Sequence, residues 1–287
     1  MRAIVITTDF SDGSKQVARF GFELAKQLRT DVTLCNAMII PAEIPQAGIV
    51  AWPVDVYDDL MEDSTKELSH LKETLLSGNQ PKDAFKPTIT CFIESGTVCD
   101  VVNHAVDLQS PGLTVVGSHQ HEGLGQWMIG NHVRGVIDTS KIPLLLVPAG
   151  THFKKVKKIA FATDFSDMRQ DLNCIRKLVT IAERLNAGIL LIHVNNEDQN
   201  TPQHYLTQIL KELTEKASYP KIDYQLIKDS RVVAGLDWLI EHGDIEMLAM
   251  VHHTHGFFTG LLKGSHTQKM AGHIQIPLLI FPDTLFV

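Results

Sequence analysis

The sequence lacks the marks of a disulfide-stabilised or membrane-spanning protein. Only 4 of its 287 residues are cysteine, and no two of them stand in a Cys-x-x-Cys pair. No apolar run approaches the ~20 residues that a membrane-spanning helix needs, and Asp9 interrupts the first apolar run where a signal peptide would continue. We therefore expect a cytoplasmic protein without membrane contact, whose cysteines are reduced, small core residues. These are Cys35, Cys91, Cys99 and Cys174.

An excess of positive charge is also absent. The chain carries 26 Lys and Arg against 33 Asp and Glu, so its formal net charge is −7 and its pI is about 6.0. Nucleic acids and anionic membranes favour clustered Lys and Arg, so neither is a predicted partner. The one short basic run, Lys154, Lys155, Lys157 and Lys158, lies between two similar halves of the chain and indicates a solvated linker.

Catalytic signatures are missing as well. There is no Gly-x-Ser-x-Gly nucleophile elbow and no Gly-x-x-x-x-Gly-Lys-Ser phosphate loop. Ser118 stands beside His119, but adjacency in the sequence does not orient a nucleophile against a base. We therefore do not predict an enzyme, although slow hydrolysis of a bound ATP stays open.

What the sequence does contain is an internal repeat. Thr-Asp-Phe-Ser-Asp occurs at 8–12 and again at 163–167, 155 residues later. Ile-Pro-Leu-Leu occurs at 142–145 and again at 276–279, 134 residues later. The two matches keep the same order, which predicts two related domains in tandem.

The boundaries of these domains follow from the repeat. We place the first domain at 1–150 and the second at 155–287. The shorter offset of the later match means that the first half carries extra residues. They fall in the segment 38–63, which is rich in Pro, Ala and Ile and suits a lid, a dimer arm or a loop.

Each half alternates strand patterns with helix patterns. Short β-branched or aliphatic runs indicate strands, and apolar residues three and four apart indicate helices. This alternation predicts parallel βαβ units with right-handed crossovers, hence an α/β fold of two doubly wound domains. Strands are expected at 4–6, 32–37, 88–94, 113–117, 143–147, 189–194, 224–228, 247–251 and 277–281. Helices are expected at 17–28, 60–76, 97–108, 172–185, 201–217 and 232–242.

The stretch 115–131 is the strongest candidate for a binding loop. Ligands of doubly wound sheets bind at the carboxyl ends of the strands. This stretch joins an apolar strand to a helix start through glycines, where unpaired backbone N–H groups can receive an anion. Asp9 and its copy Asp164 follow the first strand of each half. Either can hydrogen-bond an adenine or ribose, or simply cap a helix; because the pair recurs in one context, we favour a role in lining the site.

A strand ending in Thr-Asp-Phe-Ser, a late glycine loop and a final Ile-Pro-Leu-Leu strand resemble the universal stress protein family, here in a tandem two-domain form. The resemblance covers nearly the whole chain. It implies a five-stranded parallel sheet in each domain, in the fold of the adenine nucleotide alpha hydrolases, and pairing of the domains through their last strands. It also implies binding of ATP or AMP in some members, with Mg²⁺ accompanying the nucleotide, and it does not imply catalysis.

The family's ligand residues can be carried over one by one. In the first half they are Thr7, Asp9, Ala37, Val116, Gly117, Gln120, Gly130, Asn131 and His132. In the second half they are Asp164, Val194, Gly264, Ser265 and His266. Gln120 stands where the family has its second glycine, whereas Val251 and Thr254 replace the first two glycines of the second half. Since glycine lets a phosphate approach the backbone, nucleotide binding is predicted in the first domain rather than the second.

Two alternatives remain open. Both pockets can have lost the nucleotide, leaving an interaction or regulatory module whose segment 38–63 contacts a protein partner or a second copy of the chain. Clustered histidines at 119–121 and 252–255 also raise the question of a metal site. Alternate residues on a strand end point to opposite faces, so we expect solvated loop histidines and no metal.

Overall fold

The structure is a computed structural model of the chain, and it describes residues 3–39, 54–78, 85–120, 127–128, 131–163, 167–195, 203–229, 232–252 and 276–282. In the first domain the elements are β1 (Ala3–Thr7), α1 (Asp12–Leu28), β2 (Asp31–Met38), α2 (Val54–Leu76), β3 (Ile89–Ser95), α3 (Val98–Gln109), β4 (Leu113–Gly117), β5 (His119–Gln120), β6 (Trp127–Met128), α4 (Asn131–Thr139) and β7 (Leu144–Val147). In the second domain they are β8 (Lys158–Ala162), α5 (Met168–Leu185), β9 (Gly188–Asn195), α6 (Gln203–Ala217), β10 (Ile222–Lys228), α7 (Val232–His242), β11 (Met247–His252) and β12 (Leu278–Pro282).

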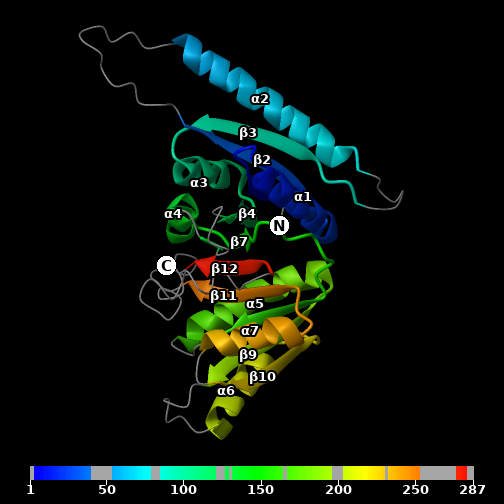
Figure 1. The fold of residues 1–287 in the computed structure, drawn as a ribbon. Helices are drawn as coiled ribbons and strands as arrows, with labels where there is room; N and C mark the ends of the chain where they lie inside the picture. Colours follow the sequence, from blue (N-terminus) through cyan, green and yellow to red (C-terminus); the bar gives the residue numbers. More distant parts are fainter. Residues whose placement is uncertain are drawn as a thin grey trace, which may run out of the picture.

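Ten of the strands form one sheet in the order β10-β9-β8-β11-β12-β7-β4-β1-β2-β3. All neighbouring pairs are parallel except β12 and β7, which run antiparallel and join the two domains (Figure 1). Each domain therefore contributes five parallel strands, and the domains pair through their last strands, as the sequence predicts. Because the junction is antiparallel, the strands of the two domains run in opposite directions within the sheet.

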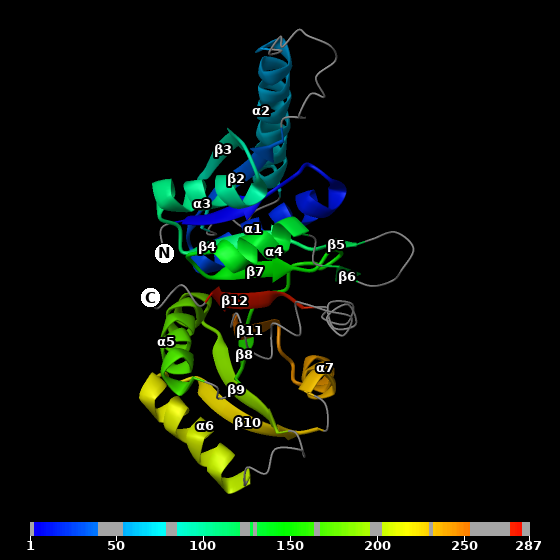
Figure 2. The ribbon, with the colours of Figure 1, turned by 90° about the vertical axis from the view of Figure 1, so that its left-hand side faces the viewer.

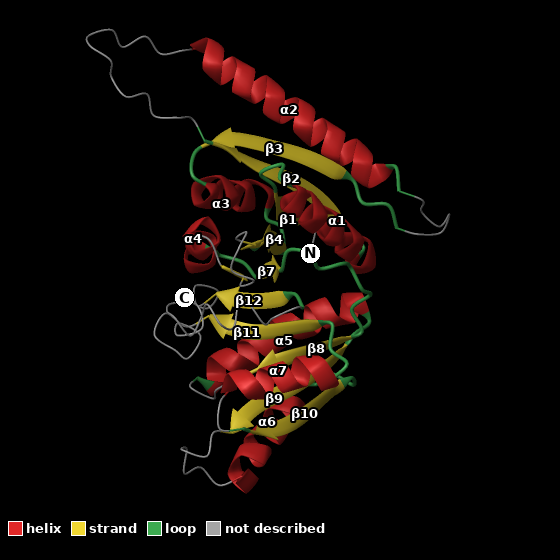
Figure 3. Cartoon of the chain, viewed as in Figure 1, coloured by secondary structure: helices red, strands yellow, loops and turns green. Residues whose placement is uncertain are grey.

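Helices cover both faces of this sheet (Figure 3). One hydrophobic cluster gathers α1, α2, α5 and α6 with one face of the strands, and a second gathers α3, α4 and α7 with the other. Figure 2 shows the two domains stacked along the sheet, with β12 next to β7 at the boundary. The strands at the centre are buried on both faces, as expected for parallel strands.

The first helix of each domain shows how the repeat fixes local structure. Ser11 caps α1 by accepting a hydrogen bond from the backbone N–H of Ser14, and Asp167 caps α5 in the same way. Both helices end at a residue in the left-handed conformation, Arg29 in α1 and Asn186 in α5. The apolar stripes between these ends face the sheet, which positions the amino termini at the carboxyl edge of β1 and of β8.

Two features differ from the prediction. Helix α2 begins at Val54, earlier than expected, so 54–63 of the extra segment is helical, while 40–53 lies outside the described residues. The strands β5 and β6 form a small antiparallel pair within the stretch 115–131, where only a loop was expected. The predicted linker lysines Lys154, Lys155 and Lys157 are exposed. Among the described residues, no helix has the length and apolar character needed to cross a membrane.

The cysteines follow the prediction in part. Cys35 and Cys174 are buried core residues, but Cys99 is only half-buried and Cys91 is exposed, so the prediction was wrong for Cys91. Cys91 lies on β3, the outermost strand of the sheet, which is covered less than the central strands. Burial raises the pKa of the Cys35 thiol to about 12, with a smaller contribution from Glu94.

These environments predict an order of thiol reactivity. The thiolate is the reactive form, so Cys35 is expected to stay unmodified by iodoacetamide in the folded protein. Cys91 is expected to react first, with a rate that rises with pH, because partial burial raises its pKa. Peptide mapping during alkylation checks this order. Cys91→Ser should remove the fastest phase and Cys174→Ser should leave it unchanged; preferential labelling of Cys35 would contradict the described packing.

Candidate functional site

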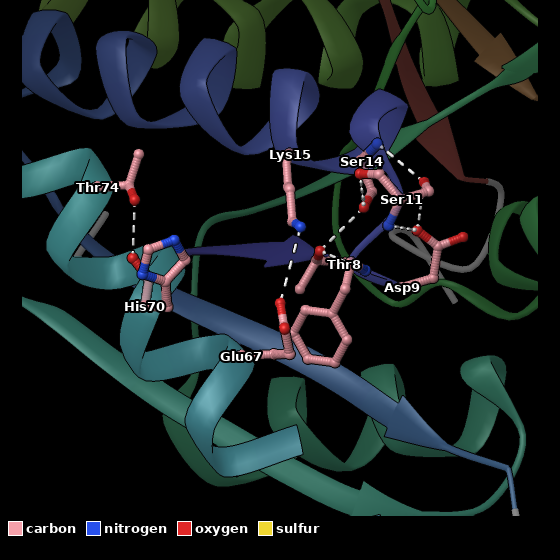
Figure 4. A network of polar contacts seen from close by, with 9 residues as sticks. Thr8, Asp9, Ser11, Ser14, Lys15, Glu67, His70 and Thr74 are labelled. Atoms are coloured by element: carbon pink, nitrogen blue, oxygen red, sulfur yellow. Dashed lines mark hydrogen bonds and ion pairs between the residues drawn. The ribbon is translucent and has the colours of Figure 1, made fainter. Parts of the chain in front are cut away.

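A network of hydroxyl and carboxylate groups lies at the carboxyl end of β1 (Figure 4). The Oδ1 atom of Asp9 accepts hydrogen bonds from the backbone N–H and the hydroxyl of Ser11, at 3.0 and 2.6 Å. The hydroxyls of Thr8 and Ser14 lie 3.0 Å apart, and Ser14 also donates to the carbonyl of Ser11. These contacts tie the strand end to the first turn of α1.

The backbone at this turn is held in an unusual conformation. Phe10 has a φ of 66°, in the left-handed region that bulky residues rarely adopt. Its N–H donates to the Thr8 hydroxyl at 3.1 Å, and the side-chain amide of Asn36 on β2 donates to the Thr8 carbonyl at 2.9 Å. The left-handed conformation costs about 1–2 kcal/mol for a residue with a side chain, so neighbouring contacts must hold the turn in place.

The turn lies where the order of the sheet reverses. β1 pairs with β2 on one side and with β4 on the other, so Asp9, which follows β1, and Gly117, which ends β4, lie at the carboxyl ends of adjacent strands. Thr7 crosses this junction, since its hydroxyl donates to the Val115 carbonyl at 3.4 Å. In doubly wound sheets such a switch point is where a crevice forms. The structure thus brings together Thr7, Asp9 and Gly117 of the predicted site.

Gly117 has a packing role that the sequence did not reveal. A Cβ atom at this position would stand 2.8 Å from Cγ2 of Val17 on α1. The first glycine of the motif is therefore required for close contact between α1 and β4, independently of any ligand. Of the predicted apolar neighbours, Ala37 is half-buried at the end of β2, whereas Val116 is buried in the core on the side of α3 and α4.

The second domain makes the same contacts with different chemistry. Thr163 donates its hydroxyl to the carboxylate of Asp171, and Nδ1 of His193 donates to the Thr163 carbonyl at 2.9 Å. Asp171 and His193 are both buried. Thus Asp171 stands where the first domain has Ser14, and His193 stands where it has Asn36. An uncharged set in the first domain corresponds to an ionisable set in the second.

The edge of β11 also differs from that of β4. Val251 and His252 are both buried at the end of the strand. Nε2 of His252 lies 3.1 Å from Oδ1 of Asp138 on α4 of the first domain. The expectation of a solvated loop histidine was therefore wrong for His252. Val194 is buried as well, and a Cβ added to Gly235 of α7 would stand 2.8 Å from it, so it belongs to the core.

Several predicted residues cannot be placed. Gly130, Asp164, Thr254, Gly264, Ser265 and His266 lie outside the described residues, as do His121, His253 and His255. Gln120 ends β5 and Asn131 begins α4. His132 is exposed in the first turn of α4. Within the described ranges, no group of three His, Cys, Asp or Glu side chains is arranged to hold a metal ion.

Sequence reasoning missed several polar residues beside the site. Thr8, Ser14 and Asn36 shape the turn, and the recurrence of Thr8 as Thr163 was the available signal. Lys15 is another: its ammonium lies 3.7 Å from Glu67, which links α1 to α2 at the edge of the site (Figure 4). Both partners are partly exposed, so this pair contributes little stability but directs a positive charge toward α2.

A separate cleft of about 860 Å³ lies between the linker and α7. Its walls carry carboxylates from Asp237, Glu241 and Glu246, facing Lys154 and His152 of the linker side. None of the predicted site residues lines it. The candidate site is therefore defined by the strand order and the turn contacts, not by this cleft.

Comparison with known protein families shows which family the chain belongs to. The model of the universal stress protein family matches residues 1–148 and again 155–282. The chain belongs to the universal stress protein family. Two copies of the family's domain account for the repeat, the ten-stranded sheet and the paired switch points. Curated proteins give no match to the chain.

Solved structures show the same architecture at low identity. A universal stress protein from Archaeoglobus fulgidus DSM 4304 matches with a TM-score of 0.68 at 13% identity, covering 98% of each chain. A protein of unknown function from Pseudomonas aeruginosa PAO1 matches at 0.58 and 10% identity, over 99% of this chain and 93% of that one. The cytoplasmic domain of a prokaryotic cation chloride cotransporter matches at 0.51 and 9% identity, over 100% and 96%. At such identities the likeness concerns the fold alone.

Proposed function

We propose that this universal stress protein binds an adenine nucleotide, ATP or AMP with Mg²⁺, in its first domain and acts in a stress response through the bound form. The observation that carries the proposal is the turn at 8–12, which lies at the switch point between β1 and β4. A strained backbone at such a place supports a functional role, because strain persists where surrounding contacts are selected to hold it.

In the first domain, different residues are assigned to different parts of the nucleotide. Asp9 is exposed at the end of β1, where a carboxylate can accept hydrogen bonds from an adenine amino group or a ribose. Ala37, half-buried on the adjacent strand, supplies apolar surface. The amino terminus of α4 begins at Asn131, and its backbone N–H groups suit the phosphates.

Electrostatics favours the first domain over the second. Asp171 places a buried carboxyl group in the first turn of α5, whereas the equivalent Ser14 is neutral. Solvent screens the charge of the exposed Asp9, whereas an ionised carboxylate at the buried position 171 would repel an anionic ligand strongly, because the surroundings there exclude water. The bulk of Val251 in place of Gly117 acts in the same direction. We therefore assign the nucleotide to the first domain alone.

A pair of matched substitutions tests the assignment. Asp9→Asn and Asp12→Asn each remove one negative charge near the start of α1, but only Asp9 lies at the switch point. Isothermal titration with ATP and Mg²⁺ is expected to show affinity reduced about tenfold or more for Asp9→Asn, since a hydrogen bond to a charged group is lost. Asp12→Asn should bind like the unaltered chain.

The variant Gly130→Asp is titrated with ATP and Mg²⁺ in the same way. An added carboxylate beside the start of α4 repels phosphate and is expected to abolish binding. Absence of heat from the unaltered protein at millimolar nucleotide would overturn the proposal. That result would favour the nucleotide-free interaction module, whereas equal affinities in the unaltered chain and the Gly130→Asp chain would mean that the nucleotide binds elsewhere, which would also overturn the proposal.

A further inference from the structure

The strand contact that joins the domains is almost the same on its two sides. β7 pairs with β12 through Leu144 with Ile280, Leu145 with Leu279 and Leu146 with Leu278. The repeat makes Leu144–Leu146 equivalent to 278–280, so the pairing is Leu-Leu-Leu against Leu-Leu-Ile. Two copies of β7 could form the same apolar pairs with each other. The strands alone therefore do not determine which domain the first domain pairs with.

A polar contact beside the strands is not symmetric. His252 at the end of β11 approaches Asp138 on α4 across the domain boundary, with Nε2 and Oδ1 3.1 Å apart. The side chain of His252 is 5% exposed and that of Asp138 is 43% exposed. A carboxylate only accepts, so Nε2 carries the proton and donates it. Within the part of the chain that the structure describes, the buried Nδ1 of His252 has no hydrogen-bond partner, and Asp138 is the group that this imidazole contacts through Nε2.

The repeat shows what like domains would place here. Counting from the shared Ile-Pro-Leu-Leu segment, the equivalent of Asp138 is Gly272 and the equivalent of His252 is Ser118. Two first domains would set Asp138 against Ser118, with its shorter side chain. Two second domains would set the buried His252 against a glycine. The hydrogen-bonded pair of carboxylate and imidazole forms only between a first domain and a second domain.

A contact on the opposite face of the sheet is also asymmetric, because the equivalent residue of the second domain could not make it. The side-chain amide of Gln27 on α1 donates to the carbonyls of Val156 and Leu185, at 2.7 and 3.0 Å, and accepts from the Val156 N–H at 3.0 Å. Counted back from the left-handed residues that end α1 and α5, the equivalent of Gln27 is Arg184. A guanidinium has no acceptor atom, so it could not replace Gln27.

We infer that the Asp138–His252 contact selects the partner of the first domain: it fits the second domain of this chain and disfavours a second copy of the first domain. The apolar strands supply attraction in either case, and the polar pair supplies the difference, because a first domain that pairs with another first domain leaves the buried imidazole of His252 without Asp138. Specificity between two nearly identical strand faces thus lies in one pair of side chains beside the junction of β7 and β12; Figure 2 shows that junction.

The test compares the mass of full-length variants in solution. Asp138→Ala and His252→Ser remove one partner each, the latter by introducing the residue found at the equivalent position. Light scattering after gel filtration is expected to show a several-fold larger dimer fraction for each variant than for the unaltered chain. Asp107→Ala is the control, since Asp107 pairs with Lys141 at 2.8 Å within the first domain; it should leave the mass distribution unchanged.

A double-mutant cycle supplies a second readout. Unfolding of the two single variants and of the combined variant should give an interaction of about fivefold or more in the unfolding equilibrium constant, as contacting residues do. Strictly additive effects would overturn the inference. So would a dimer fraction that stays at the unaltered level in both single variants, because the contact would then stabilise the interface without selecting the partner.

Discussion

Replacing Leu145 by alanine is expected to destabilise the protein by about 2–5 kcal/mol, the cost of deleting a fully buried leucine side chain. Leu145 is 0% exposed and lies opposite Leu279, itself 1% exposed, at the centre of the strand pair that joins the domains. The cavity opens on the face of the sheet where Leu145 packs in the cluster that includes α1 and α5, and the backbone of β7 is held by hydrogen bonds to β4 and β12, so it cannot collapse into the cavity. Such a loss is a large fraction of the stability of an ordinary domain.

Denaturant unfolding followed by circular dichroism measures this effect. Leu108→Ala is the matched control, because Leu108 is 62% exposed on α3 and its truncation should change the free energy of unfolding by less than about 0.5 kcal/mol. A loss below about 1 kcal/mol for Leu145→Ala would mean that the antiparallel junction is not a packed part of the core.

Replacing Gly117 by valine is expected to lower stability by about 1–3 kcal/mol and to abolish nucleotide binding. The new Cβ would stand 2.8 Å from Val17, so α1 must move away from β4 or Val17 must leave its rotamer. Since α1 starts at the turn that carries Asp9, any such movement also displaces the proposed adenine contact. The variant therefore gives the first domain the residue that the second domain has at position 251.

The second domain also indicates how the strain can be relieved. Counted back from the left-handed residues that end α1 and α5, Val17 corresponds to Cys174, so the second domain combines a smaller helix residue with the larger strand residue Val251. Val17→Cys in the Gly117→Val background is expected to recover at least half of the lost stability. Thermal unfolding checks the stability and titration with ATP checks the binding. A Gly117→Val chain as stable as the unaltered one would contradict the packing described for Gly117.

Most of the fold could be predicted from the internal repeat. Thr-Asp-Phe-Ser-Asp marks the end of β1 and of β8, and Ile-Pro-Leu-Leu marks the strands that join the domains. Because parallel strands buried on both faces must be continuous apolar runs, and the helices between them must show one apolar stripe, these patterns are legible in one sequence. Ser11, which caps α1, is also of a residue type that is typical of helix caps.

What the sequence did not show depends on tertiary contacts. The pairing of His119 with Met128 in β5 and β6 is too short to leave a period of two. His252 is buried where it contacts Asp138, which is 114 residues away in the chain. Cys91 is exposed because its strand, β3, lies at an edge of the sheet. The early start of α2 at Val54 was hidden because the residues before it resemble a loop in composition.

The candidate site was predictable only where local chemistry repeats. Asp9 and Gly117 were found from the motif, and the structure brings them to adjacent strand ends. The replacement of Ser14 and Asn36 by Asp171 and His193 could not be read from the repeat, because Thr163 and Asp171 are eight residues apart whereas Thr8 and Ser14 are six apart, and these two extra residues shift the alignment. That replacement is the physical reason for treating the two sites as unequal.

Native mass spectrometry of the full chain with ATP and Mg²⁺ tests the central claim, that only one of the two related sites is kept. The account predicts saturation at one nucleotide per chain, with that nucleotide lost in Gly117→Val and retained in Asp171→Asn, because the assigned site lies in the first domain. Two nucleotides per chain, none at all, or one that survives Gly117→Val would contradict it.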